Sequence, residues 1–203
     1  MIAIIDYDAG NIKSVEKALH ALGEDAIITR NPEIILAADK VILPGVGAFG
    51  DAMGKIREYA LAEVIHAVVD KNTPFLGICL GMQLLFESSE ESPGVKGLGI
   101  CRGAIHKIPE GRGSKVPQIG WNSLEFPCEG RLFRGVKTGA YVYFVHSYFL
   151  KATEPIVTAT TEYVTTIHAA IEKNNVFACQ FHPEKSSDTG LQILKNFIEI
   201  TDK

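Results

Sequence analysis

The first half of the chain alternates short apolar runs with longer segments in which apolar residues recur every three or four positions. Four apolar runs have the length and composition of buried strands: residues 2–6, 26–30, 40–44 and 74–78. Two segments between them place apolar residues on a single helical face: Val15, Ala18, Leu19 and Leu22, then Leu61, Val64, Ile65 and Val68. This alternation predicts an α/β fold with a mostly parallel sheet that helices cover on both faces.

The second half follows a different pattern. After Gly97 the chain contains several short β-like runs separated by Gly and Pro, which predict additional antiparallel strands. The longest run, residues 141–149, is aromatic and has the composition of one strand. Residues 190–200 predict a closing helix. No repeat, linker or low-complexity segment interrupts the 203 residues, so we expect a single domain over residues 1–203.

Composition narrows the range of partners and locations. Hydrophobic residues make up 46% of the chain, enough for a substantial core. A net charge of −4 without a Lys/Arg cluster argues against nucleic acid as the main partner. Asp6 and Asp8 stand where a signal peptide requires positive charge, and no uncharged run reaches membrane-spanning length. We therefore expect a cytoplasmic protein that does not contact a membrane.

The four cysteines predict neither a disulfide framework nor a metal site. They stand at positions 79, 101, 128 and 179 without a CxxC pair, and free thiols suit the cytosol. Cys179 and His182 have the only metal-like spacing, and two ligands are too few for a structural zinc ion. We expect no metal and no cofactor.

The segment GICLGMQ, residues 77–83, has the pattern of a nucleophile elbow. An apolar strand ends at Cys79, good helix formers follow, and Gly77 and Gly81 stand two residues to either side. Glycines at these positions relieve the crowding of a tight strand-to-helix turn. A thiol at a helix start is also favoured as the thiolate. The alternative is a buried structural cysteine, because free Cys is among the most buried residue types.

A nucleophilic cysteine requires a base, and residues 176–186 offer one. If the strand predicted there continues to its end, His182 and Glu184 share one face with Gln180, so that Glu184 orients the His182 ring. Pro183 between them suits the end of a strand, since it donates no hydrogen bond. The alternative for His182 alone is a structural histidine.

The other histidines compete less well for the role of base. Four of them have no carboxylate two residues later: His20, His66, His106 and His168. His146 lies within the aromatic run 141–149, and the pattern leaves open whether it points into the core or towards a site.

The Gly-rich segment at residues 40–51 offers a third component of acyl chemistry. Gly-rich loops allow backbone N–H groups to point at a ligand. One N–H of this loop and the N–H of Leu80 are candidates for an oxyanion hole. The alternative is a tight connection without a site, and the segment lacks the Lys-Ser or Lys-Thr ending of a phosphate-binding loop.

Together these segments resemble the class I (triad) glutamine amidotransferases. The resemblance is greatest to one subfamily, the glutaminase subunits of imidazole glycerol phosphate synthase, from histidine biosynthesis. Seven motifs carry it: GNIKSVEKAL (10–19), LPGVGAFGDAM (43–53), GICLGMQLLFESSEE (77–91), PGVKGLG (93–99), PQIGWN (117–122), YFVHSYF (143–149) and FHPEKS (181–186). The resemblance runs from residue 2 to residue 197, with no departure at a triad position.

The resemblance implies a role for each candidate residue. Cys79 is the expected nucleophile, His182 the base and then acid, and Glu184 the residue that orients His182. The loop at Gly45, Val46 and Gly47 is expected to stabilise the oxyanion together with Leu80, and Gln83 to hold the substrate, L-glutamine. The expected partner face carries four residues: Asn11, Trp121, Tyr143 and Lys185. Trp121 and Tyr143 have an alternative reading as core aromatics, and Lys185 as a solvated turn residue.

The resemblance also implies a partner. Ammonia released from glutamine passes to a (β/α)8-barrel cyclase subunit, which makes imidazole glycerol phosphate and an aminoimidazole carboxamide ribonucleotide. That barrel needs about 250 residues, so we expect it to be a separate protein in a heterodimer. Alternatives are a Cys–His peptidase or related α/β hydrolase, a non-catalytic regulatory subunit, and a glutaminase for anthranilate, aminodeoxychorismate or pyridoxal phosphate synthesis.

Overall fold

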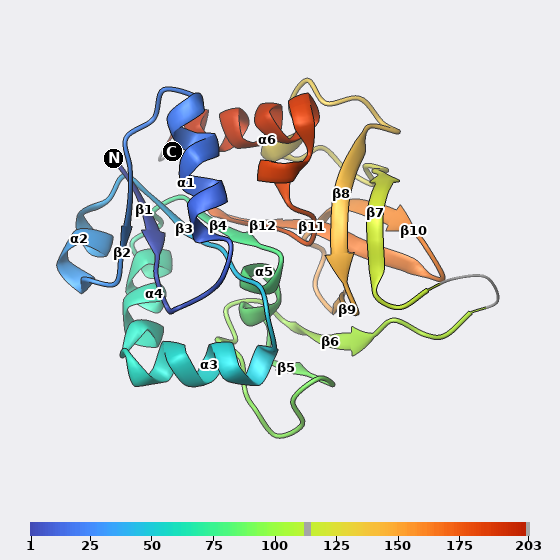
Figure 1. Ribbon diagram of the computed structural model, residues 1–203, viewed down its shortest axis with the longest axis horizontal. Coiled ribbons are helices and arrows are strands. Elements are labelled where there is room, and N and C mark those ends of the chain that lie inside the picture. Colours follow the sequence, from blue (N-terminus) through green and yellow to red (C-terminus); the bar gives the residue numbers. More distant parts are fainter. Residues whose placement is uncertain (112–114, 202–203) are drawn as a thin grey trace.

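The structure, a computed structural model, describes residues 1–111 and 115–201, and its centre is a twisted β-sheet (Figure 1). In the described residues this sheet has ten strands in the order β2-β1-β3-β4-β12-β11-β9-β6-β5, with β10 paired to β11. Its parallel half consists of β1 (Ile2–Ile5), β2 (Ala26–Thr29), β3 (Lys40–Leu43), β4 (Phe75–Ile78) and β12 (Val176–Cys179). The four strands predicted in the first half are therefore confirmed.

The second half of the chain extends the sheet with antiparallel strands, also as predicted. These are β6 (Gly103–Lys107), β9 (Tyr148–Ala152), β10 (Val157–Glu162) and β11 (Thr166–Lys173); the short β5 (Ser88–Ser89) pairs parallel to β6. A separate antiparallel pair is formed by β7 (Gln118–Ser123) and β8 (Tyr141–His146). The prediction of one strand over residues 141–149 is wrong, because the run breaks at Ser147 and its two parts join different sheets.

Helices cover both faces of the parallel half. Figure 1 shows α1 (Ile12–Ala21) and α6 (Ser187–Glu199) on one side and α3 (Phe49–Glu58) and α4 (Leu61–Asp70) on the other. The short α2 (Pro32–Ala37) packs beside α4. Alternation along β1 explains the two layers: Ile2 and Ile4 join the core under α1 and α6, whereas Ala3 and Ile5 join the core under α3 and α4. This confirms the α/β architecture.

Tertiary contacts limit one predicted helix. Good helix formers continue to Ser88, yet α5 (Leu80–Leu84) ends at Leu84. The carbonyl oxygens of residues 84–87 accept hydrogen bonds from backbone N–H groups of residues 97–101, which replaces the helical pattern. Two single turns of 3-10 helix complete the described elements: η1 (Arg131–Phe133) and η2 (Pro183–Lys185). Within residues 1–111 and 115–201, no helix has the length and apolar content needed to span a membrane.

Candidate active site

Three neighbouring parallel strands bring the predicted site residues to one edge of the sheet. β4 lies between β3 and β12, and all three run in the same direction. The Gly-rich loop follows β3, Cys79 follows β4, and His182 lies three residues beyond β12. Because the carboxyl ends of parallel strands meet, segments far apart in the sequence become neighbours here.

Cys79 occupies a strained turn between β4 and α5. Its backbone has φ 55° and ψ −111°, a conformation that non-glycine residues rarely adopt. The flanking glycines are required sterically: a Cβ on Gly77 would lie 2.8 Å from the Gly81 oxygen, and one on Gly81 would lie 1.8 Å from the Leu43 oxygen. The predicted elbow geometry is therefore present in the structure.

The thiol of Cys79 lies beside a pocket of about 230 Å³. Cys79 is only 6% exposed, yet it lines this pocket, so it is not enclosed in the core. Its Sγ lies 3.7 Å from Gln180 Nε2 and 4.0 Å from the Val145 oxygen. The Cys79 N–H donates to the Cys179 oxygen over 2.8 Å, which fixes the elbow to β12.

His182 and Glu184 form the expected pair, but not on a continuous strand. β12 ends at Cys179, and residues 183–185 form the single turn η2, so the prediction that the strand continues to its end is wrong. Pro183 begins this turn because its fixed φ suits a first helical position. The turn still places His182 Nδ1 2.8 Å from Glu184 Oε1, with both side chains buried.

Two opposing effects set the protonation of His182. Burial lowers the pKa of His182, but the neighbouring Cys79 and the hydrogen-bonded carboxylate of Glu184 outweigh burial and raise the pKa to about 9. Nε2, the ring nitrogen not facing Glu184, has no partner in hydrogen-bonding geometry among the described residues. The ring therefore carries a proton at pH 7.

The carboxylate of Glu184 contacts both His182 and Asn11. Its Oε1 also accepts a 2.7 Å hydrogen bond from Asn11 Nδ2, while Oε2 has no partner among the residues described. Asn11 precedes α1 with φ 68°, a conformation that Asn tolerates better than most residues. Asn11, which was predicted for the partner face, is thus half-buried and in direct contact with the carboxylate of Glu184.

The predicted oxyanion loop lies against the elbow. Val46 and Gly47 line the pocket with Cys79 and Leu80. The Leu80 N–H, expected to face an oxyanion, instead donates to the Gly45 oxygen over 3.2 Å. Gly45 has no room for a side chain, since a Cβ would lie 1.9 Å from Tyr7 Oη. An oxyanion can reach the Leu80 N–H only after the Gly45 oxygen has moved away.

Gln83 also lines the pocket, although its amide is engaged internally. Gln83 Nε2 donates to Gln180 Oε1 over 2.9 Å and to the Tyr148 oxygen over 3.1 Å. The side-chain oxygen therefore remains as an acceptor for a substrate donor.

The sequence did not single out several residues of the pocket. They are Glu91, Val145, Ser147 and Tyr148. Glu91 lies in the motif of residues 77–91, and its Oε2 accepts from the Phe49 N–H over 2.8 Å. An acidic side chain at this pocket suits the α-ammonium group of an amino acid. The acidic residues at the end of that motif are the sequence signal that could have identified Glu91.

The structure answers the open question about His146. It lines the pocket, with Nδ1 2.8 Å from the Tyr148 oxygen and Nε2 3.0 Å from Gln118 Oε1. Burial lowers the pKa of His146 to about 4, further lowered by the charge of His182 and opposed by the bond to Tyr148. The ring is therefore neutral at pH 7. Because the Tyr148 oxygen only accepts, Nδ1 is the donor, and Nε2 is then an acceptor that pairs with Gln118 through the NH2 group of its side-chain amide.

The remaining predicted partner-face residues lie on or near the β7–β8 pair. Trp121 is 52% exposed, which excludes its reading as a core aromatic. It packs edge-on against half-buried Tyr143 with 6.1 Å between ring centroids. Lys185 is exposed in η2. Ile119 and Tyr141 add to the exposed apolar area of the same strands.

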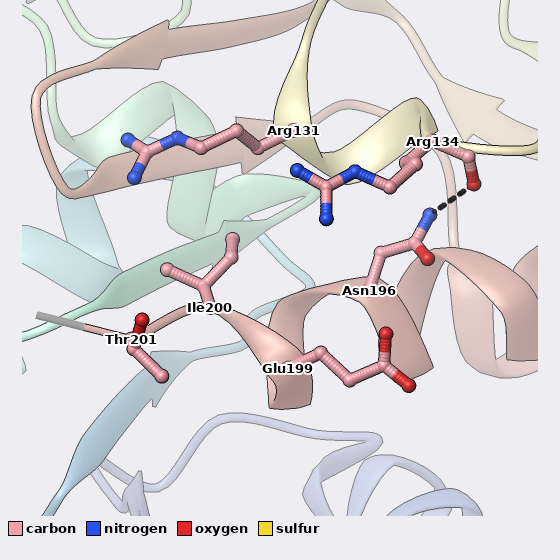
Figure 2. Close-up of a pocket in the computed structure, with 6 residues that line it drawn as sticks. All are labelled: Arg131, Arg134, Asn196, Glu199, Ile200 and Thr201. Carbon is pink, nitrogen blue, oxygen red and sulfur yellow. Dashed lines mark hydrogen bonds between the residues drawn. The ribbon is translucent and has the colours of Figure 1, made fainter. Parts of the chain in front are cut away.

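A second cavity, of about 290 Å³, lies between η1 and the C-terminal end of α6, and Figure 2 shows the residues that line it. Six residues line it: Arg131, Arg134, Asn196, Glu199, Ile200 and Thr201. Arg131 binds Glu172 and the β11–β12 turn through Asn174 and Asn175, and Asn196 donates to the Leu132 and Arg134 oxygens. The Arg131 contacts tie η1 to the β11–β12 turn, and the Asn196 contacts tie η1 to α6, so this cavity has a structural explanation.

Comparison with known proteins agrees with this fold. Residues 3–200 match the model of the glutamine amidotransferase class-I family, and the chain belongs to that family. A crystal structure of a glutamine amidotransferase superposes with a TM-score of 0.75 at 19% identity, covering 97% of this chain and 99% of the other, which concerns the fold alone.

Closer relatives define the group within the family. The chain is 50% identical over 200 residues to imidazole glycerol phosphate synthase subunit HisH of Methanocaldococcus jannaschii, covering 98% of this chain and 100% of that protein. It is 51% identical over 201 residues to the HisH subunit of Caldanaerobacter subterraneus subsp. tengcongensis, covering 98% of both. Within the class-I family, the chain is thus a member of the HisH group.

Proposed function

We propose that this protein is the glutaminase subunit of an imidazole glycerol phosphate synthase and that Cys79, His182 and Glu184 are its catalytic residues. The observation that carries the proposal is the juxtaposition of a strained elbow cysteine with a buried His–Glu pair at the ends of neighbouring strands. The reaction is hydrolysis of L-glutamine to L-glutamate and ammonia.

The proposed mechanism uses each triad residue once per half-reaction. An imidazolium next to a cysteine stabilises the thiolate, which attacks the side-chain amide carbon. His182 gives its proton to the leaving nitrogen, ammonia departs, and a glutamyl thioester remains. Water then attacks the thioester, His182 takes the proton of that water, and glutamate leaves as the thiolate re-forms. Glu184 holds the ring orientation throughout.

We further propose that turnover requires a backbone movement at the oxyanion loop. The Gly45 oxygen accepts the Leu80 N–H, so the peptide between Gly45 and Val46 has to rotate before this N–H meets the oxyanion. Gly45 precedes the peptide, and Gly47, with φ 107°, follows Val46, so glycines on both sides of Val46 give the loop the freedom for such a rotation.

The partner is proposed to be a separate (β/α)8-barrel cyclase subunit that consumes the ammonia. The relatives named above are subunits of a synthase, which favours histidine biosynthesis over the other partner pathways. The exposed apolar strands β7 and β8 lie beside the pocket and support a docking role, since Val145 of β8 lines it. The free cysteines support a cytoplasmic location.

Substitution of Cys79 tests the proposal directly. Cys79→Ala should abolish glutamine hydrolysis while the protein folds normally, whereas Cys128→Ala, which changes an exposed cysteine, should leave it intact. The complex with Cys79→Ala should still form product from added ammonium salt, because only the nitrogen supply is lost. Glutamine turnover by Cys79→Ala, or failure of the assembled complex with both nitrogen sources, would refute the proposal.

A further inference from the structure

Ser186 stands at the start of α6 but does not cap the helix. Serine at this position usually accepts a hydrogen bond from a backbone N–H of the first turn. Here the Ser186 side chain makes no capping bond. The hydroxyl is instead buried, with Ser186 only 1% exposed, and it faces η2 and β8.

The Ser186 hydroxyl takes part in a closed ring of hydrogen bonds around His182. Ser186 Oγ donates to the His182 oxygen over 2.6 Å and accepts from the Tyr143 N–H over 2.9 Å. The His182 N–H donates to the Tyr143 oxygen over 2.9 Å. The N–H and oxygen of His182 and those of Tyr143 are therefore all held within one ring.

The packing around this ring leaves little room for movement. A Cβ on Gly190 of α6 would lie 1.9 Å from the Pro183 oxygen and 2.8 Å from Ser186 Cβ. The first turn of α6 therefore presses against η2, and the two ring members Ser186 and His182 are each only 1% exposed. Buried hydrogen bonds shielded in this way fix geometry more strongly than exposed ones.

We infer that Ser186 is a positioning residue for His182, and that its hydroxyl joins the base to strand β8. This inference rests on the proposed glutaminase function, because it concerns the same base. The side chain of Tyr143 packs against exposed Trp121, so the ring connects the triad to the β7–β8 surface by backbone contacts. A shift of β8 moves the His182 backbone with it.

The test compares Ser186→Ala with the neighbouring control Ser187→Ala, which removes an exposed hydroxyl. Ser186→Ala should lower kcat for glutamine about tenfold or more with KM little changed, because small displacements of a catalytic group cost rate. An NMR titration of the His182 ring should show its pKa falling from about 9 towards its ordinary value, since the ring sits less well between Cys79 and Glu184. Ser187→Ala should match the wild type in both measurements.

Wild-type kcat and an unchanged His182 titration in Ser186→Ala would overturn the inference. If Ser186→Ala does not fold, Ser186→Thr and Ser186→Cys replace it. The hydroxyl of Thr should retain the wild-type kcat and the raised His182 pKa. The weakly bonding thiol of Cys should lower both. Equal kcat values and equal His182 pKa values in Ser186→Thr and Ser186→Cys would also overturn the inference. A wild-type protein that does not hydrolyse glutamine would refute the proposed function, while the titration would still decide the role of Ser186.

Discussion

Asn11 Nδ2 donates a 2.7 Å hydrogen bond to Glu184 Oε1, the same oxygen that lies 2.8 Å from His182 Nδ1. One carboxylate oxygen therefore serves both an amide from the start of α1 and the imidazole of the base. Asn11 is half-buried, so part of it remains accessible at the surface, as its proposed role in partner binding requires. Asn11 can act on the triad and on an interface at once.

Asn11→Gly should lower kcat about tenfold. Hydrogen bonds to charged groups contribute about 1.5–3 kcal/mol, and only part of this energy is expected to appear as a higher activation barrier. Glycine tolerates the φ of 68°, so backbone strain is not introduced. The matched control is Asn72→Gly, at an exposed Asn with φ 62°. Steady-state glutaminase assays that give equal rates for the two variants would contradict this role.

His182→Ala should be nearly as damaging as Cys79→Ala, whereas Glu184→Gln should be milder. The base transfers protons in both half-reactions, but the carboxylate contributes orientation and stabilisation of the imidazolium. The measurement is kcat for the three variants at saturating partner. Equal losses in Glu184→Gln and Cys79→Ala would show that Glu184 does more than orient the ring.

The pH dependence of stability should report on His146. Its pKa is about 4 when folded, below the ordinary 6.5, so the unfolded chain takes up the proton first as the pH falls. The contribution of neutral His146 to the free energy of unfolding is fully present above about pH 6.5 and is lost as the pH falls towards 4. Thermal unfolding of His146→Gln should therefore vary less with pH in this window than that of the wild type; parallel curves would refute this.

His182 should act in the opposite direction. Its folded pKa of about 9 lies above the ordinary 6.5, so its contribution to stability is full below 6.5 and is lost as the pH rises through 9. His182→Ala should remove this part of the alkaline dependence of the melting temperature. An unchanged slope between pH 6.5 and 9 in that variant would contradict the raised pKa.

Trp121→Ala should weaken partner binding by about 2 kcal/mol or more, as expected when a buried aromatic anchor is truncated. Ile27→Ala is the control, because Ile27 is an exposed apolar residue on β2, an edge strand of the ten-stranded sheet, whereas Trp121 lies in the separate β7–β8 pair. Titration calorimetry or surface binding with the purified cyclase subunit gives the dissociation constants. Similar constants for Trp121→Ala and the wild type would remove Trp121 from the interface.

The sequence predicts the parallel half of the fold well because its interior strands β1, β3, β4 and β12 are almost entirely buried on both faces. Such strands appear as short uninterrupted apolar runs, as at residues 74–78, and elbow glycines mark where one of them ends. The break at Ser147 has no comparable signal, since the aromatic pattern continues across it. Side-chain pattern does not tell which sheet a strand joins.

The active site also combines features that the sequence predicts with features that it does not. Spacing correctly paired His182 with Glu184, although for the wrong reason: a turn begun by Pro183, and not strand alternation, brings them together. The contact of Leu80 with Gly45 has no sequence signal, because both partners are backbone atoms. Asn11 and Ser186 are fixed by long-range contacts that a single sequence does not reveal.

The placement of the site on β3, β4 and β12 also determines how activity is lost on heating. These strands lie in the interior of the sheet order, flanked by further strands on both sides, and central strands open only with the whole cooperative unit. Fraying of the edge strands β2 or β5 would leave the elbow and the base together. Thermal inactivation should therefore coincide with global unfolding, and amide exchange at Ile78 and Cys79 should be as slow as the slowest in the molecule.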